Sequence, residues 1–169
     1  MNLSFDVITR EGDKVIVSLT SFYPYISELI GDKFPLLEIV EIAIVRESGM
    51  ASIKMEVFRK IAEILIDIAQ DNPNTILYYF CDMSESLPNQ RIGRNLSSQE
   101  YRNNLFKLLF QRYSGQASEH WSDVEVEMRS TKPDLTMYAH FLLRDQHLPL
   151  VEILKGEVFN NFNTILEQK

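Results

Sequence analysis

The sequence predicts one α+β domain in which about six strands form a mostly antiparallel sheet with three helices, in the order βββ-α-β-α-ββ-α. Two pairs of segments with alternating apolar residues, one pair near each end of the chain, predict strand hairpins. A continuous apolar strand lies between them, and three stretches show helical spacing of apolar residues. With 169 residues, 45% hydrophobic and 24% charged, the chain fits a single domain spanning residues 1–169.

The N-terminal third predicts three strands. Residues 3–7 and 15–19 each alternate between apolar and polar side chains, and the turn around Gly12 joins them into a hairpin. Residues 36–45 predict the third strand. Its alternation changes phase between Ile39 and Val40, which predicts a β-bulge there.

Three helices follow from apolar periodicity and from helix-end signals. The first is expected over residues 52–70, and Pro73 ends it. Ser97 and Glu100 form a capping-box pattern that begins the second helix. The last helix begins near Pro149, and Gly156 within it predicts close packing at that position.

Residues 75–81 are apolar at every position after Thr75, which predicts a strand covered on both faces near the middle of the sheet. Residues 82–96, which follow, show no usable periodicity and predict a long loop. Loops of that length at the end of a strand are frequent functional sites.

The candidate ligand-binding or partner-binding residues are Asp82, Arg91, Arg94 and Arg102, at this loop and on the helix after it. Residues 86–115 carry a net charge of +4, which leaves −11 for the rest of the chain. Arginine side chains suit carboxylates and phosphates. The alternative is that these cations pair with acidic strands nearby or lie solvated, since those on the helix do not share one face.

Neither cysteine nor histidine chemistry is indicated. Cys81 ends an apolar strand without a histidine nearby in sequence, which favours a buried structural thiol. His120, His140 and His147 show no metal-ligand spacing, and we expect no metal site. No glycine-rich phosphate loop or other cofactor motif is present in the sequence, and we expect no cofactor.

Net charge and composition restrict the class of protein further. A net charge of −7 and a pI near 5.0 argue against non-specific binding to nucleic acid or to anionic lipid. No apolar stretch is long enough to suggest a membrane span, and the N-terminal residues do not resemble a signal peptide. With a single cysteine, the chain is expected in the cytoplasm.

Two segments carry a resemblance to a known family. Residues 79–82 (Tyr-Phe-Cys-Asp) and 101–106 (Tyr-Arg-Asn-Asn-Leu-Phe), with the aromatic Tyr113, resemble a family of small uncharacterised proteins found mainly in Bacteroidetes. The likeness covers residues 37–166 in layout. The chain departs from that family in its longer loop after Asp82 and in Tyr113, where a Trp-Phe pair is expected nearby. The resemblance implies the same fold outline and a bacterial cytoplasmic origin, and it implies no activity.

Three functions stay open at this point. The first is a protein-interaction or regulatory module without catalysis, with an acidic protein as its partner. The second is a small enzyme on an anionic substrate, with Asp82 as the base and Arg91 and Arg94 as the anion clamp. The third is a weak nucleic-acid binder that uses the region between Arg91 and Arg112.

Overall fold

The computed structural model describes residues 1–10, 12–21, 34, 36–47, 55–81, 97–116, 120–130 and 136–167, the last seven of them and residues 46 and 98 by backbone only. The elements are β1 (Asn2–Ile8), β2 (Lys14–Ser21), β3 (Glu38–Arg46), α2 (Met55–Asp71), β4 (Thr75–Cys81), α3 (Ser98–Tyr113), η1 (Ser114–Gln116), β5 (Trp121–Arg129), β6 (Thr136–Arg144), η2 (Asp145–Leu150) and α4 (Val151–Glu167). The predicted α+β class and element order are confirmed.

The strands form one six-stranded sheet in the order β1-β2-β3-β4-β6-β5. β3 and β4 pair in parallel, while the other neighbours pair antiparallel. The sheet is therefore mixed but mostly antiparallel. The parallel pair is possible because α2 carries the chain back between β3 and β4, as a crossover connection requires.

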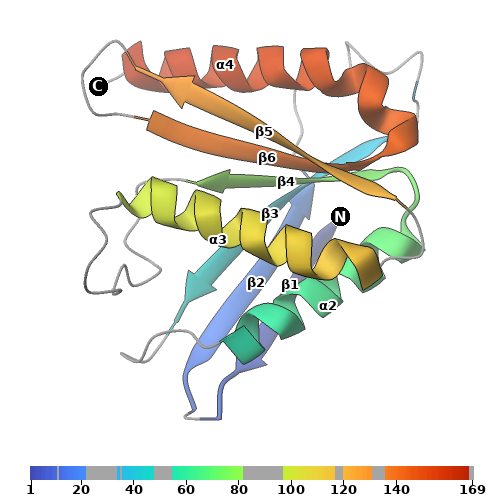
Figure 1. The fold of residues 1–169 in the computed structure, drawn as a ribbon, viewed down its shortest axis with the longest axis vertical. Coiled ribbons are helices and arrows are strands. Elements are labelled where there is room, and N and C mark those ends of the chain that lie inside the picture. Colours follow the sequence, from blue (N-terminus) through green and yellow to red (C-terminus); the bar gives the residue numbers. More distant parts are fainter. Residues whose placement is uncertain are drawn as a thin grey trace.

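Helices cover both faces of the sheet (Figure 1). α2 and α3 pack on one face, where β4 contributes Leu77, Tyr79 and Cys81 to the core. α4 packs on the opposite face, where β4 contributes Ile76 and Tyr78. β4 thus has apolar partners on both sides, which confirms the position predicted from its unbroken apolar run.

The predicted β-bulge in β3 is wrong. The register with β4 runs without interruption, pairing Ile39 with Ile76 and Val40 with Leu77. Ile39 is buried toward α4 and Val40 toward α2, since β3 at this point is covered on both faces. The change of phase in the sequence therefore reflects two-sided burial of a regular strand.

The helix-end signals meet different outcomes. The capping box of α3 is confirmed, because Ser97 N–H donates to Glu100 at 2.8 Å and Glu100 N–H donates to the Ser97 hydroxyl at 3.2 Å. Pro149 lies in η2, directly before α4. The close packing predicted at Gly156 is wrong, because the residue is exposed and an added Cβ would meet nothing within 4 Å.

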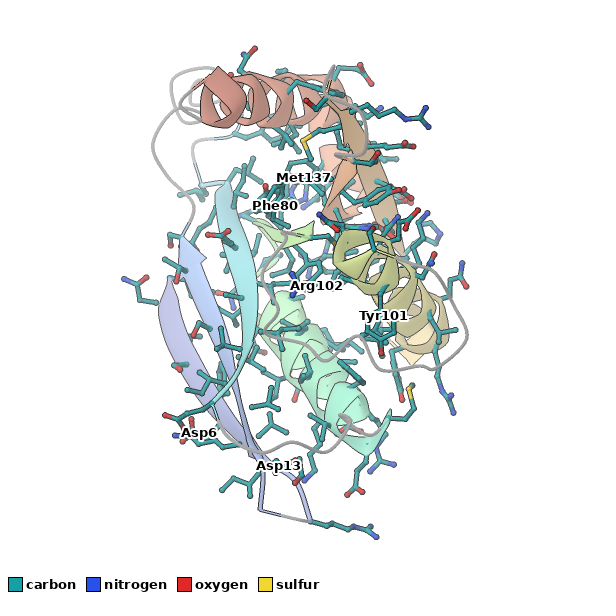
Figure 2. All side chains as sticks on the ribbon, turned by 90° about the vertical axis from the view of Figure 1, so that its left-hand side faces the viewer. Asp6, Asp13, Phe80, Tyr101, Arg102 and Met137 are labelled. Atoms are coloured by element: carbon teal, nitrogen blue, oxygen red, sulfur yellow. The ribbon has the colours of Figure 1, made fainter. Side chains whose placement is uncertain are left out.

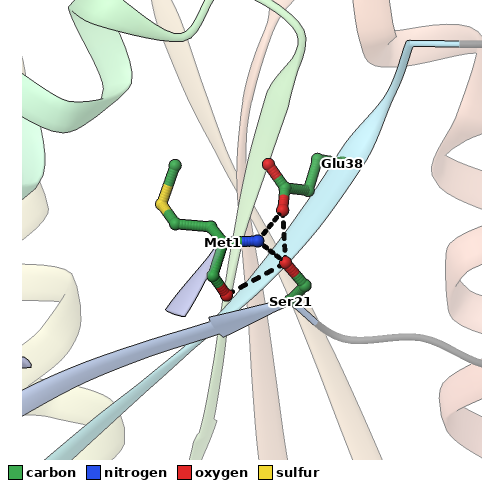
Figure 3. A network of polar contacts seen from close by, with 3 residues as sticks. All are labelled: Met1, Ser21 and Glu38. Carbon is green, nitrogen blue, oxygen red and sulfur yellow. Dashed lines mark hydrogen bonds and ion pairs between the residues drawn. The ribbon is translucent and has the colours of Figure 1, made fainter. Parts of the chain in front are cut away.

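A polar network joins the ends of β1, β2 and β3 (Figure 3). The amino group of Met1 donates to the Ser21 hydroxyl and to the Glu38 carboxylate. Burial by itself raises the pKa of Glu38, but the hydrogen bonds from Met1 and Ser21 outweigh it and hold that pKa below its ordinary value. The network therefore stabilises this corner of the sheet while Glu38 is ionised.

Candidate functional site

Of the four candidate residues from the sequence, the structure describes one. Asp82, Arg91 and Arg94 lie outside the described residues. Arg102 is buried, with 3% of its surface exposed, and lies on the inner side of α3 (Figure 2). Cys81, the residue before Asp82, is also fully buried.

The described cations of the positive segment do not converge. Lys107 forms an ion pair with Glu125 of β5. Arg112 is exposed and stacks over the ring of Tyr113, with its guanidinium carbon 5.9 Å from the ring centroid. With Arg102 turned inward, these three side chains point to three different surroundings, so they do not form a common anion site.

A buried polar cluster that the sequence did not reveal joins α3 to β5 and β6. His140 of β6 is completely buried. Its Nδ1 lies 2.8 Å from a carboxylate oxygen of Asp123, and its Nε2 lies 2.7 Å from Oδ1 of Asn103 on α3. The Asn103 amide group donates to Glu125 at 3.2 Å, and Lys107 completes the chain of contacts at the surface.

Both ring nitrogens of His140 are occupied by neighbouring polar groups. The Asn103 Nδ2 atom donates to a carboxylate, so its Oδ1 must accept from the ring. The other ring nitrogen, Nδ1, faces the Asp123 carboxylate. Through these contacts the cluster connects α3 to the sheet.

Electrostatics at the outer end of the cluster favour an ionised Glu125. Partial burial raises the pKa of the Glu125 carboxyl. The hydrogen bonds from Lys107 and Asn103 and the electrostatic effects of Lys107 and His140 lower that pKa by a larger amount. The net pKa lies below the ordinary glutamate value. Asp123 and Glu125 of β5 thus hold α3 in place.

A second buried cluster lies at the other end of β6. The Arg144 guanidinium donates to the carbonyl of Pro73 at 2.7 Å and to that of Ala69, at the C-terminal end of α2. The same guanidinium lies over the Trp121 ring, 4.6 Å from its centroid. Carbonyls at a helix end have no partners within the helix, so Arg144 satisfies groups that would otherwise be left unbonded.

His147 lies close to this cluster and is 1% exposed. Its Nδ1 finds no hydrogen-bond partner among the residues that the structure describes. Burial and the neighbouring charge of Arg144 both lower the pKa of His147, which favours the neutral ring.

Metal binding finds no support in the described part of the chain, where no three histidine, cysteine, aspartate or glutamate side chains come together. His120 is exposed beside Asp145, with the two side chains 2.9 Å apart, whereas His140 and His147 are buried in separate clusters.

An apolar groove lies between α2 and α3 in the described structure. Above the sheet the two helices leave a cavity of about 80 Å³. Ala62, Leu65 and Ile66 line it from α2, and Leu109 and Phe110 line it from α3. All five are only partly buried, so the groove reaches the surface.

The floor and the ends of the groove are also largely apolar. Its other lining residues are Ile44, Ile61, Ala69, Leu77, Phe106, Tyr113, Ser114, Trp121 and Leu142. Their arrangement around a partly open space depends on how two helices pack, which periodicity along each helix does not give.

The comparisons with known proteins add no identity. No family model, no curated protein and no solved structure matches this chain. The resemblance to the Bacteroidetes family therefore stays a prediction. Among the described helices, none combines the length and the apolar character needed to cross a bilayer.

Proposed function

We propose that this protein is a protein-binding module whose groove between α2 and α3 receives an apolar side chain of its partner. The observation that carries the proposal is the groove itself, a partly open cavity lined almost entirely by apolar side chains. Binding sites combine apolar walls with a small number of polar groups that orient the ligand. Here the polar atoms on the lining residues are few, which favours an apolar occupant.

The size of the cavity decides between kinds of apolar occupant. A dry cavity of about 150 Å³ in another protein holds one benzene molecule. At about 80 Å³, this groove is too small for a long acyl chain or a polycyclic ligand, but it suits one aliphatic side chain. A partner polypeptide that inserts a leucine-sized anchor is the occupant of the right volume.

The exposed Arg112 beside the groove suggests which kind of residue lies next to the apolar anchor side chain in the partner. Arg112 is exposed and stacks on Tyr113, which lines the groove. A carboxylate next to the anchor residue would meet this guanidinium, and an arginine fork favours such a partner. The acidic partner expected from the sequence is thus retained in the proposal, with Arg112 in place of the loop arginines.

The two buried clusters support binding over chemistry. The two ring nitrogens of His140 contact Asp123 and Asn103, and Arg144 donates hydrogen bonds to backbone carbonyls at the end of α2. These polar groups fix the helices on which the groove depends. A rigid groove lowers the entropy lost on binding.

A selection from displayed random peptides tests the proposal. We expect enriched sequences with an aliphatic residue beside an aspartate or glutamate. Ala62→Leu, which fills the groove from α2, should weaken their binding at least tenfold. Ala43→Leu on the exposed opposite face of β3 is the matched control and should leave binding unchanged. Enriched peptides that bind Ala62→Leu as tightly as the original protein, or a selection without a consensus, would contradict the proposal.

A further inference from the structure

Strand β1 is an edge strand with little protection against pairing. It lies at the margin of the described sheet, beyond β2, with Asp6 exposed near its end (Figure 2). The opposite edge, β5, carries the exposed charged residues Glu127 and Arg129, and such charges discourage pairing with another chain. In β1 the one charged residue is Asp6.

The hydrogen bonds to β2 show which backbone groups of β1 face outward. Ser21 N–H donates to Met1 at 2.7 Å, and Thr9 N–H donates to Asp13 at 2.8 Å. In an antiparallel ladder, bonded pairs alternate with non-bonded pairs. The odd-numbered residues of β1 therefore bond to β2, and the even-numbered residues direct their N–H and C=O groups toward the open edge.

The outward-facing residues are accessible. They are Asn2, Ser4, Asp6 and Ile8, and all of them are exposed, Ile8 by 60%. On the α2 side of the same strand, Leu3 is 43% exposed and Phe5 is half-buried. The edge thus combines outward-facing backbone groups with an apolar row that continues the core beneath α2.

We propose that β1 pairs antiparallel with β1 of a second copy of this chain, about a two-fold axis at Phe5. In this register, every even-numbered residue from Asn2 to Ile8 finds a bonded partner, with Ser4 opposite Asp6 of the other copy. Phe5 faces its own copy, and Leu3 faces Val7. The two sheets become one continuous sheet, and the exposed apolar row of each copy is covered by that of the other.

Charge and length select this register over its neighbours. If the two-fold axis lay at Asp6 instead of Phe5, Asp6 of one copy would face Asp6 of the other. Like charges directly opposite each other are destabilising. If the axis lay at Ser4, Ile8 would have no partner in the other copy. The two-fold axis at Phe5 avoids both, and it gives Asp6 a hydroxyl as its neighbour.

Opposite charges introduced at Ser4 test the pairing and its register together. Ser4→Lys places an ammonium opposite Asp6 of the other copy and should tighten the dimer about three- to tenfold, since symmetry creates the pair twice. Ser4→Asp places two carboxylates opposite each other and should weaken it by a similar factor. Ser4 is exposed, so both variants are expected to fold.

The readout is sedimentation equilibrium over a range of concentrations, with a dissociation constant of about 10 µM to 1 mM expected because one strand pair makes a small interface. Thr20→Lys and Thr20→Asp are the controls, on β2 opposite Asn2 and away from the edge. These should leave association unchanged.

Three results would overturn the proposal. One is a protein that remains monomeric at millimolar concentration, which would show that β1 does not pair with β1 of a second copy. Another is weakening by both charges at Ser4, which would indicate a register with Ser4 opposite itself. The third is an equal response to the Thr20 variants, which would place the contact on the sheet face. The groove has no described lining residue on β1, so these outcomes leave the proposed function untouched.

Discussion

Two buried polar side chains of β6 each join the sheet to a helix. His140 holds α3 through Asn103, and Arg144 holds the end of α2 through backbone carbonyls. Buried polar groups cost free energy unless they are bonded, so each cluster stabilises only while it is complete. Removal of a single member should therefore cost more than the loss of one exposed hydrogen bond.

Asn103 and Asn104 offer a matched test of the His140 cluster. Asn103 is 5% exposed and bonds to both His140 and Glu125, whereas Asn104 is exposed. We expect Asn103→Ala to lower the free energy of unfolding by about 1–3 kcal/mol, because it leaves buried donors and acceptors unbonded. Asn104→Ala should change it by less than about 0.5 kcal/mol. Urea denaturation measures both, and equal effects would show that the cluster contributes nothing.

The lowered pKa of the buried His147 predicts that the stability of the fold depends on pH. Its pKa in the fold lies below the ordinary histidine value of 6.5, so the unfolded chain binds more protons than the folded chain as the pH falls through that value. Stability is therefore lost on acidification from about pH 6.5 and stops falling below the pKa in the fold. His147→Leu should remove this part of the loss between pH 7.5 and 5, measured by urea denaturation.

The exposed His120 is the control for that experiment, because its side chain is 75% exposed. His120→Leu should keep the acid-side loss that His147→Leu removes. If the two variants give the same slope of stability against pH, the burial of His147 has no effect on its protonation.

At the scale of elements, the described contacts that hold each helix to the sheet differ in kind. α2 and α3 are each held by a buried cluster, and the groove lies between them. α4 covers the other face through Leu154 and Val158, while Gly156 between them is turned to solvent. A glycine in this setting contributes flexibility to the unfolded chain without a packing role in the fold.

Two glycines make opposite predictions. Gly156→Ala should raise the free energy of unfolding by about 0.5–1 kcal/mol, because the position is helical and an added Cβ meets nothing within 4 Å. Gly12→Ala should lower stability, because its φ of +86° disfavours any residue with a Cβ. Thermal unfolding of the two variants checks both signs. Destabilisation by Gly156→Ala would mean that α4 packs more closely there.

At the scale of the whole molecule, the fold could be predicted from local patterns, but its polar clusters could not. The apolar run of β4 and the capping box at Ser97 are encoded by near neighbours in sequence, and both are confirmed. His140 and Asn103 are brought together only by the packing of α3 on the sheet. The change of phase in apolar alternation at Ile39 led to the wrong prediction of a bulge, because a regular strand buried on both faces gives the same sequence pattern.

The candidate site shows the same limit. The loop residues Asp82, Arg91 and Arg94 lie outside the described part of the chain, so the structure leaves them as predictions. Arg102, the fourth candidate, is described and buried, and its position on the inner side of α3 depends on which face of that helix meets the sheet. The apolar residues of α3 spread too widely around the helix to decide this from sequence.

The central claim is that the groove between α2 and α3 accepts an apolar group from outside, and methyl NMR under xenon pressure tests it most directly. Xenon occupies small apolar cavities. We predict saturable shifts at the methyl groups of Leu65, Leu109 and Leu142, which line the groove. Ala62→Leu should abolish these shifts, and Ala43→Leu should preserve them. Absent shifts in the original protein, or equal shifts in Ala62→Leu, would contradict the account.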